Sequence, residues 1–238
     1  MKKITFLLTL GLLFSFFSLS MAAEKPRLGV LRFTNHTSAG WWSGSVGTEL
    51  QDMLAAELTS LGAFQVLERK EIDAVLGEQD LGASGRVDSQ TKAKIGKIKG
   101  AKYLVAGTVS AFEEQTSGGG GGISVMGFSV GGKNDKAYMA VDLKVIDTTT
   151  GEIVDARTVE ANSSSFGLAL GASVGSVSGS LGKYEKTPTG KAIRACIMEI
   201  AEYLECSLVK GKNDPCMSEY AGKESTRREK TKKSINLE

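Results

Sequence analysis

The amino-acid sequence predicts an α+β domain in which helices pack on a mixed β-sheet. Strand and helix patterns interleave over residues 27–109, an antiparallel hairpin pattern follows at residues 137–159, and an amphipathic helix pattern comes near the C-terminus. Two long glycine- and serine-rich segments, 113–136 and 161–186, stand on either side of the hairpin. A compact domain seldom contains structureless loops of this length, so the two segments call for an explanation of their own.

The sequence begins with the features of an export signal. Two lysines follow Met1, an apolar run covers residues 4–19, and small residues at Ala22 and Ala23 suit a signal peptidase. Residues 1–22 are therefore expected to be a signal peptide. Removal of Lys2 and Lys3 with this peptide lowers the formal net charge from +2 to zero, and the remaining chain shows no basic footprint for nucleic acid.

Three strands and three helices are expected before the first glycine-rich segment. The expected strands are 27–33, 64–67 and 102–109, and the expected helices are 46–61, 69–79 and 88–99. In the first strand, Leu28, Val30 and Phe33 are expected to face inward because strand side chains alternate between the two faces of a sheet. Residues 34–44 form the loop between this strand and the first helix.

Each expected helix has apolar residues at helical spacing. Either Ser43 or Ser45 is expected to cap the first helix, and Gly62 is expected to end it. The core faces of the second and third helices are expected to contain Ile72, Val75, Leu76, Ile95 and Ile98.

The C-terminal part contains the hairpin, a helix and a polar end. The hairpin strands are expected at 137–147 and 153–159, and Pro188 is expected to open a helix over 189–208. Residues 211–238 are expected to form a polar, flexible tail. In an oxidising compartment Cys206 is expected to pair with Cys216, whereas Cys196 is expected to be buried as a small apolar side chain.

The second glycine-rich segment has a strand pattern. Its larger apolar residues alternate with small ones, and these larger residues are Phe166, Leu168, Leu170, Ala172 and Val174. Each arm of either segment has about the ~10 residues that a tilted strand needs to cross a bilayer. A single hairpin in lipid leaves unpaired backbone groups, so such hairpins would have to form a barrel with copies of themselves. The alternative is that both segments are mobile surface loops.

The sequence has few residues that suit catalysis. His36 is the only histidine, no Gly-x-Ser-x-Gly motif is present, and no cysteine–histidine set has the spacing of a zinc site. Residues 127–133 match Gly-x4-Gly-Lys but lack the Ser or Thr that would hold magnesium. Glu113 and Glu114 are the remaining candidate, as a pair of carboxylates. We expect no enzyme activity and no cofactor or metal.

Trp41 and Trp42 are the only tryptophans, and they lie in the loop after the first strand. One interpretation is that they anchor this loop on the core. The other is that they meet a pore, a partner or a polypeptide substrate.

The sequences at residues 103–109, continuing into Phe112 and Glu113, and at residues 140–154 resemble the CsgG family. This family is the curli production assembly/transport component, which forms the outer-membrane secretion channel for curli subunits. The resemblance extends from about Pro26 to Leu208, and both glycine-rich insertions stand at the expected places. It implies an anticodon-binding-domain-like periplasmic domain built from residues 23–112, 137–160 and 187–210.

The resemblance also implies an oligomer and a gate. Nine subunits would form a ring, and each subunit would give two hairpins, 113–136 and 161–186, to one shared transmembrane barrel. The alternating apolar residues of the second hairpin would face the membrane. The loop after the first strand would narrow the channel, and its lining residues would be Asn35, His36, Trp41 and Trp42. The implied partners are further copies of the chain, secreted polypeptides, outer-membrane lipid and periplasmic accessory proteins.

One departure from the family keeps a second function open. The curli channel is a lipoprotein with a cysteine directly after its signal peptide, and no cysteine lies near the expected cleavage site at Ala22 here. This difference favours an alternative in which the protein is a soluble periplasmic binding or accessory module without pore activity.

Overall fold

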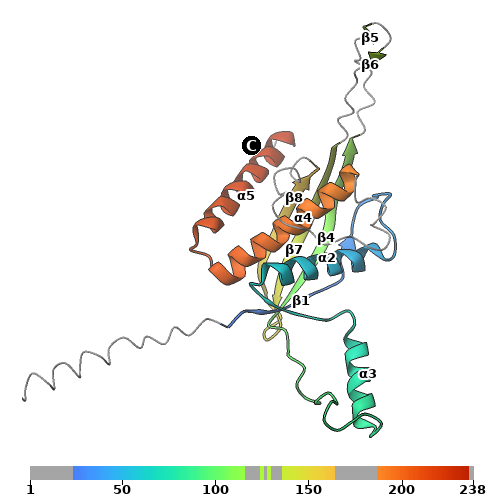
Figure 1. Ribbon diagram of the computed structural model, residues 1–238. Helices are drawn as coiled ribbons and strands as arrows, with labels where there is room; N and C mark the ends of the chain where they lie inside the picture. The colour runs from blue at the N-terminus through green and yellow to red at the C-terminus, as the bar shows by residue number, and fades with distance from the viewer. Residues whose placement is uncertain (1–23, 116–123, 126–127, 130–135, 164–186, 236–238) are drawn as a thin grey trace, which may run out of the picture.

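The computed structural model describes residues 24–115, 124–125, 128–129, 136–163 and 187–235 (Figure 1). The expected signal peptide and most of the two glycine-rich segments lie outside the described residues. The apolar residues expected to face the membrane also lie outside them: Phe166, Leu168, Leu170, Ala172 and Val174.

A mixed sheet forms the body of the molecule, as the sequence predicts, and it has six strands where five are expected, because residues 34 and 35 of the expected loop form a short strand. Its order is β3-β1-β4-β7-β8, and a short strand β2 pairs with β4 beside this path. Strands β1, β2 and β3 run parallel to their neighbours, whereas β7 runs antiparallel to both β4 and β8. The strands are β1 Arg27–Val30, β2 Thr34–Asn35, β3 Gln65–Leu67, β4 Tyr103–Gln115, β7 Lys136–Asp147 and β8 Ile153–Asn162.

The hydrophobic core lies between one face of this sheet and two helices, α2 Val46–Leu61 and α4 Pro188–Glu205 (Figure 1). Leu28, Val30 and Phe33 are all buried, which confirms their expected inward orientation. Gly107 on β4 leaves room for the Phe33 ring, because a Cβ atom at position 107 would stand 2.3 Å from Phe33 Cε1.

The ends of the two core helices follow their local sequence. Ser45 occupies the N-cap position of α2 without a side-chain cap hydrogen bond, and Gly62 ends the helix with a φ of 67°, as expected. The Thr187 side chain accepts a hydrogen bond from the Gly190 amide at 3.2 Å, and Pro188 begins α4. A π-helix, Cys206–Lys210, continues directly from α4.

The expected core faces of the second and third helices are wrong. Helix α3, Ile72–Ala83, projects from the end of the domain opposite β5 and β6 (Figure 1), and Val75 and Leu76 are 40% and 44% exposed. Residues 88–99 form turns instead of a helix, with Gly96 at a φ of 77°. The helix face of the sheet is already covered by α2 and α4, so this segment does not pack on it.

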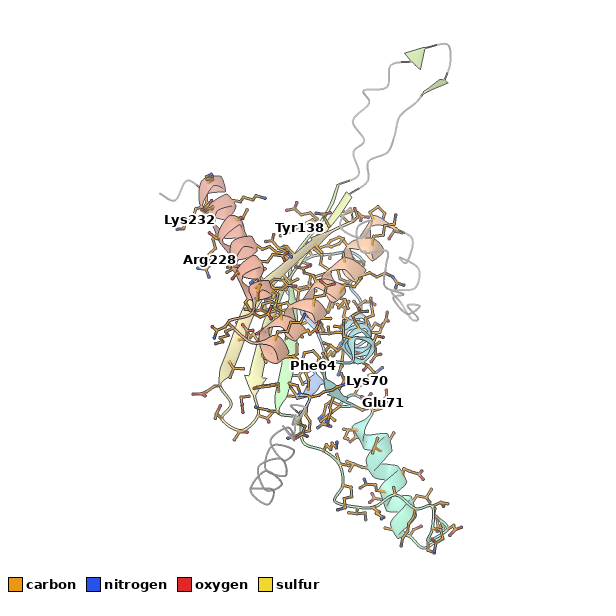
Figure 2. All side chains as sticks on the ribbon, turned by 60° about the vertical axis from the view of Figure 1, so that its left-hand side comes forward. Phe64, Lys70, Glu71, Tyr138, Arg228 and Lys232 are labelled. Carbon is orange, nitrogen blue, oxygen red and sulfur yellow. A yellow bond between two sulfur atoms is a disulfide. The ribbon has the colours of Figure 1, made fainter. Side chains whose placement is uncertain are left out.

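Residues 68–101, which we call the arm, are tied to the domain at their base. Lys70 Nζ lies 2.7 Å from Asp52 Oδ2 on α2, and the Arg69 guanidinium donates to the Lys99 carbonyl at 2.9 Å. Figure 2 shows Lys70 and Glu71 at the point where the arm leaves the body. The arm therefore has a fixed base, while several of its apolar side chains are exposed and have no cover among the described residues.

The expectation of a flexible tail is also wrong, because residues Pro215–Ser234 form helix α5. The Asp214 side chain caps this helix by accepting from the Cys216 amide at 3.0 Å. The expected disulfide between Cys206 and Cys216 is confirmed and ties α5 to the end of α4, and Cys196 is a buried free thiol, as expected. None of the helices in the described part of the chain is long and apolar enough to cross a bilayer.

Candidate functional site

Both glycine-rich segments leave the sheet and return to it at one end, which we call the hairpin root. The β4–β7 ladder ends with Gln115 opposite Lys136, and the β7–β8 ladder ends with Tyr138 opposite Asn162. The Ser163 amide adds a hydrogen bond to the Ala137 carbonyl at 2.8 Å. The strands thus extend a few residues beyond the expected boundaries at 112 and 137, and the ends of the first segment are paired.

The start of α4 belongs to the same hairpin root. Thr189 Oγ1 donates to Glu114 Oε1 at 2.9 Å, which joins the first turn of α4 to the last residues of β4. The chain that leaves β8 at Ser163 must therefore come back beside the place where β4 ends. Segments 116–135 and 164–186 each begin and end at this one end of the domain.

Part of the first segment is described, and it contains two short strands that pair antiparallel with each other. Strands β5, Ser124–Val125, and β6, Phe128–Ser129, pair with each other with Val125 opposite Phe128. Figure 1 shows this pair far out from the end of the sheet. Residues 116–123, 126–127 and 130–135 of this segment lie outside the described residues, so a complete membrane hairpin stays a prediction.

A β-bulge in β4 decides which side chains face the helices at the hairpin root. Val109 stands opposite Val141, but Ala111 stands opposite Ala140, so Ser110 is an extra residue on β4. This shift brings Phe112 and Glu114 to the helix face and sends Glu113 to the other face. Glu113 and Glu114 therefore do not form the paired carboxylates that an acid–base site would need.

The face that carries Glu113 contains a half-buried phenol. Tyr138 is the cross-strand neighbour of Glu113. Burial raises the pKa of Tyr138, and the negative charge of Glu160 raises it further, so the phenol stays neutral at physiological pH.

The loop after β2 starts with a compact turn. Asn35 Oδ1 accepts from the Thr37 amide at 2.9 Å and from the Thr37 hydroxyl at 2.8 Å. The His36 amide donates to the Val109 carbonyl at 2.9 Å, which continues the pairing of β2 with β4. The Asn35 side chain thus holds the backbone turn, whereas the His36 side chain is exposed.

The two tryptophans have different environments. Trp41 is only 5% exposed, and its ring stands edge-on to Phe112 with centroids 5.3 Å apart. Trp42 is half-buried and packs edge-on to Trp41 at 5.7 Å. Trp41 therefore anchors the loop on the core, which was one of the two interpretations.

The role of Asn35, His36, Trp41 and Trp42 in a constriction stays a prediction, because a constriction is a property of an assembled ring. Of these four residues, His36 is exposed, whereas Trp42 is half-buried and packs against the edge of the core.

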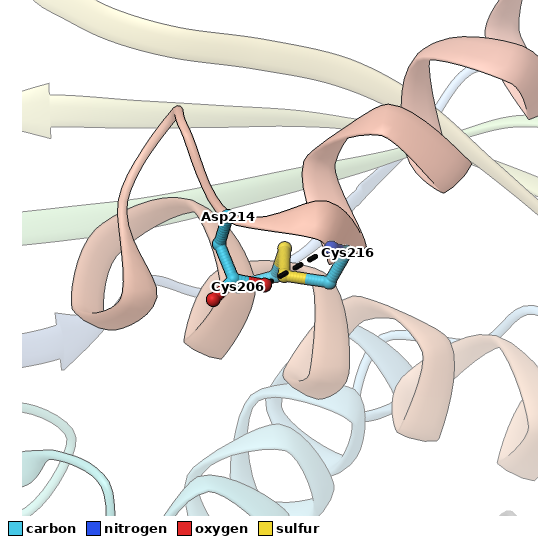
Figure 3. Close-up of side chains that lie close together, drawn as sticks. All are labelled: Cys206, Asp214 and Cys216. Carbon is cyan, nitrogen blue, oxygen red and sulfur yellow. Dashed lines mark hydrogen bonds between the residues drawn. A yellow bond between two sulfur atoms is a disulfide. The ribbon is translucent and has the colours of Figure 1, made fainter.

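One group of side chains has the composition of a metal site. The ligand atoms of Cys206, Asp214 and Cys216 all lie within 4.8 Å of one another. The two sulfur atoms are bonded to each other, however, and Asp214 Oδ1 accepts from the Cys216 amide (Figure 3). The group therefore offers no thiolate and serves to start α5.

Sequence reasoning missed two contributors to the hairpin root. Phe112 supplies the ring against Trp41, and Thr189 binds Glu114 across 75 residues of sequence. The only local signal for Phe112 is the alternation of β4, which the bulge at Ser110 interrupts. Thr189 lies on α4, and its contact with Glu114 joins residues that are distant in the sequence.

One of the comparisons with known proteins identifies a family, and the solved structures show weak likeness. The family model for the curli production assembly/transport component CsgG matches residues 10–235. Among curated proteins, none is similar enough in sequence to count as a relative.

Solved structures give low scores. The hypothetical protein CT253 from Chlamydia trachomatis shares 14% identity over 76% of this chain and 97% of its own, with a TM-score of 0.43. The PelC dodecamer from Paraburkholderia phytofirmans shares 13% identity over 73% of this chain and 84% of its own, with a TM-score of 0.37. Lipoprotein GNA1162 from Neisseria meningitidis shares 12% identity over 58% of this chain and 82% of its own, with a TM-score of 0.32. Likeness at this level carries no argument about assembly or function.

Proposed function

The chain belongs to the CsgG family of curli production assembly/transport components, and from this premise we propose that it is a subunit of an oligomeric outer-membrane channel for the export of polypeptides. Residues 1–22 direct it out of the cytoplasm. The described α+β domain lies in the periplasm, and segments 113–136 and 161–186 enter the membrane.

The observation that carries the proposal is the common hairpin root. Four chain positions, Gln115, Lys136, Ser163 and Thr187, lie at one end of the same domain. Two segments that leave and return at one end are suited to project side by side in one direction. Strands β5 and β6 of the first segment pair antiparallel with each other, which is the arrangement that a hairpin requires.

Closure of the barrel requires several copies of the chain. Two hairpins supply four strands, which are too few for a closed barrel, and an open edge in lipid costs several kcal/mol for each unpaired backbone group. Cyclic symmetry solves this problem, because each subunit pairs its hairpin edges with those of its neighbours. The exposed apolar residues of the arm, among them Val75, Leu76 and Ile95, are further surface available for contact between copies.

The loop after β2 provides the gate in this proposal. Trp41 is anchored beside Phe112 at the hairpin root, so the remainder of the loop is held close to the channel entrance. A ring of loops carrying His36 and Trp42 would pass an unfolded polypeptide and exclude folded proteins. Such a gate works by size alone and needs no catalytic residue or cofactor.

The test combines size, shape and conductance. The protein, expressed with its export segment, is extracted from outer membranes in mild detergent, imaged by negative stain and inserted into planar bilayers. We expect rings with a central hole and stepwise conductance. Replacing Trp42 by Ala should raise the conductance of each channel, while Val154→Ala at the opposite end of the sheet should leave it unchanged.

Removal of residues 165–181 supplies the decisive variant. The domain should keep its disulfide and its circular dichroism, because these residues contribute no strand to the described sheet, but membrane insertion and conductance should be lost. Retention of both membrane insertion and conductance after this deletion would contradict the proposal.

A second candidate is a soluble periplasmic module that binds a partner protein. It is favoured by the closed core of a single chain together with the apolar surface of the arm, which has no cover within the described chain. A soluble monomer, cut by protease within residues 113–136 and 161–186, would support this candidate over the channel.

A further inference from the structure

We propose that the C-terminal end of α5 binds the anionic headgroups of the membrane surface that the hairpins enter. This cationic end consists of Arg228, Lys230, Lys232 and Lys233. The inference rests on the proposed function, because that function places a membrane beyond the hairpin root. It adds a binding surface that does not depend on insertion of the hairpins.

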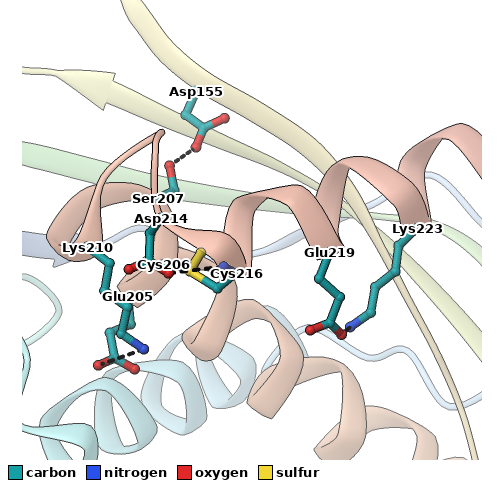
Figure 4. The surroundings of a disulfide bond; sticks show 9 residues. All are labelled: Asp155, Glu205, Cys206, Ser207, Lys210, Asp214, Cys216, Glu219 and Lys223. Atoms are coloured by element: carbon teal, nitrogen blue, oxygen red, sulfur yellow. Dashed lines mark hydrogen bonds and ion pairs between the residues drawn. A yellow bond between two sulfur atoms is a disulfide. The ribbon is translucent and has the colours of Figure 1, made fainter.

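Helix α5 is held firmly at its N-terminal part. The disulfide between Cys206 and Cys216 fixes its first turn, and the Arg157 guanidinium lies 5.0 and 5.1 Å from the ring centres of Tyr203 and Tyr220. Arg157 also donates to the carbonyl oxygen of Tyr220. Figure 4 shows how the disulfide, the contact of Asp155 with Ser207 and the ion pair of Glu219 with Lys223 surround this junction.

The helix runs along β8 toward the hairpin root. Tyr220 packs at Arg157. Three residues further along β8, the Arg227 guanidinium lies near Glu160, with Nε 4.0 Å from Oε1. Residues 228–234 continue in this direction for about 10 Å at ~1.5 Å per residue. The last three residues of β8 and Ser163 cover a similar length, at ~3.3 Å per residue.

Both general views place the end of α5 at the hairpin end of the molecule. In Figure 1 its C-terminus lies near the level where β4 and β7 leave the sheet. In Figure 2, Arg228 and Lys232 follow one another along α5, and Lys232 lies on the side of the molecule from which the first segment projects. The cationic end therefore lies at the same end of the molecule as the hairpin root.

The charges at this end are available to a ligand. Among the described residues, none forms an ion pair with Lys230, Lys232 or Lys233. Arg228 contacts Glu224 at 2.6 Å, yet its side chain remains 71% exposed. Between positions 228 and 234 the only acidic residue is Glu229. Cations at the C-terminus of a helix also complement the helix dipole. This effect accounts for Lys232 and Lys233 in the last turn but not for the further cations Arg228 and Lys230.

A hollow between α5 and β8 adds donors for a phosphate. It is lined by Glu160, Lys223, Thr226, Arg227, Lys230 and Thr231. Ammonium and hydroxyl groups donate hydrogen bonds to phosphate oxygens. Lys230 is the cation of this hollow with no ion pair among the described residues, whereas Lys223 pairs with Glu199 and Glu219. Arg227 pairs with Glu224 and lies near Glu160, and the Thr231 hydroxyl donates to the Arg227 carbonyl. A lipid phosphate at the edge of the bilayer matches this chemistry, and the position beside the hairpin root favours a lipid surface over an acidic protein.

The expected effect follows from the number of charges. A cation close to an anionic membrane surface strengthens binding by about 1 kcal/mol, which corresponds to about five-fold. Neutralising all four cations should therefore weaken binding by at least about ten-fold, even when salt screens part of the attraction.

The experiment measures flotation of the full mature chain with phosphatidylcholine vesicles, with and without phosphatidylglycerol. The test variant is Arg228→Gln/Lys230→Gln/Lys232→Gln/Lys233→Gln. The matched control is Arg86→Gln/Lys92→Gln/Lys94→Gln/Lys97→Gln, which removes one arginine and three lysines from exposed positions of the arm. Both are also made in the chain that lacks residues 165–181, so that headgroup binding is read without insertion.

We expect flotation only with the anionic vesicles, at least ten-fold weaker binding for the test variant and wild-type binding for the control, with or without residues 165–181. Equal losses in the two variants, or no loss in either, would overturn the inference. Binding to polyglutamate together with no binding to anionic vesicles would also overturn it and point to an acidic protein. Conductance reports the channel separately, so failure of the channel is distinguishable from failure of this binding.

Discussion

The ring of Trp41 stands edge-on to the ring of Phe112, with centroids 5.3 Å apart and planes at 69°. This contact joins the loop after β2 to the last inward-facing positions of β4. The proposed gate and the first proposed membrane hairpin therefore share one buried support, and a change in either aromatic residue is expected to reach both.

Replacing Trp41 by Ala should lower the free energy of unfolding by about 3–5 kcal/mol, because a large buried side chain leaves a cavity. Trp42→Ala should cost much less, since Trp42 is only half-buried. Urea unfolding of the mature chain measures both values. A double-mutant cycle of Trp41→Ala with Phe112→Ala should give a coupling of about 0.5–1.5 kcal/mol for the edge-on pair.

Equal costs for the two tryptophan variants would show that Trp41 is not the anchor. A coupling near zero would show that Trp41 and Phe112 contribute independently.

The second prediction concerns two glycines with opposite roles. A Cβ at Gly107 would lie 2.3 Å from Phe33 Cε1, whereas a Cβ at Gly77, inside α3, would meet no atom within 4 Å. Gly107→Ala should therefore destabilise the domain by about 1–3 kcal/mol or more, because the Phe33 ring must move within a packed core. Gly77→Ala should increase the helical stability of α3 by about 0.5–1 kcal/mol.

Urea unfolding measures the first change, and hydrogen exchange of the α3 amides measures the second. If Gly107→Ala left the free energy of unfolding unchanged, Phe33 would have an alternative position within the core.

The features that the sequence predicts correctly are those with long, regular patterns and a core to cover them. Strands β1, β4, β7 and β8 and helices α2 and α4 all have apolar faces that meet in one core. The pattern of Val75 and Leu76 is of the same kind, yet both residues are exposed. Periodicity identifies an apolar face but cannot identify what covers it, and in this chain α2 and α4 already cover the helix face of the sheet.

Other features depend on contacts between distant residues. The bulge at Ser110 arises from the pairing of β4 with β7, and Thr189 meets Glu114 across 75 residues. Helix α5 is mostly polar, and its contacts with the domain include Cys216 and Tyr220 near its start. No apolar stripe along its length therefore predicts it. For the candidate site, the sequence located the loop but left two interpretations for Trp41.

The third prediction concerns pH. Hydrogen bonds from Arg227, followed by those from Arg228, lower the pKa of Glu224 to about 2. A carboxyl group with a lowered pKa stabilises the folded state above its ordinary pKa of 4.5, and this contribution is lost as the pH falls toward 2. Glu224→Gln should therefore cost about 1 kcal/mol at neutral pH, a value that allows for solvent screening of the partly exposed pair.

The difference between wild type and Glu224→Gln should shrink between pH 4.5 and pH 2 when urea unfolding is followed across this range. Glu229→Gln is the control on the same helix, because Glu229 is exposed and should give no comparable difference. A difference that stays constant down to acidic pH would show that the effect of Glu224→Gln is not electrostatic.

The fourth prediction concerns the disulfide and the free thiol. Cys206 and Cys216 are separated by 10 residues, and closing a loop of this length stabilises the folded state by about 3 kcal/mol through the entropy of the unfolded chain. The variant Cys206→Ser/Cys216→Ser should lose about this amount. Its α5 should also loosen from Tyr203, because noncovalent contacts alone would then hold the helix. These contacts are those of Tyr220 with Tyr203 and Arg157, and the exposed ion pairs of Lys223 with Glu199 and of Arg227 with Glu160. Near-ultraviolet circular dichroism of the tyrosines and protease cleavage within 211–234 measure this release.

Cys196 is the internal control for this experiment. Burial raises the pKa of the Cys196 thiol, so in the folded protein it should react with a thiol reagent far more slowly than after unfolding. In the double variant Cys196 should remain slow to react, because it faces β8 from α4 and not from α5. Fast labelling of Cys196 in that variant would mean that loss of the disulfide opens the core itself. Slow labelling combined with protease cleavage in α5 would show that the disulfide serves to hold this one helix against the domain.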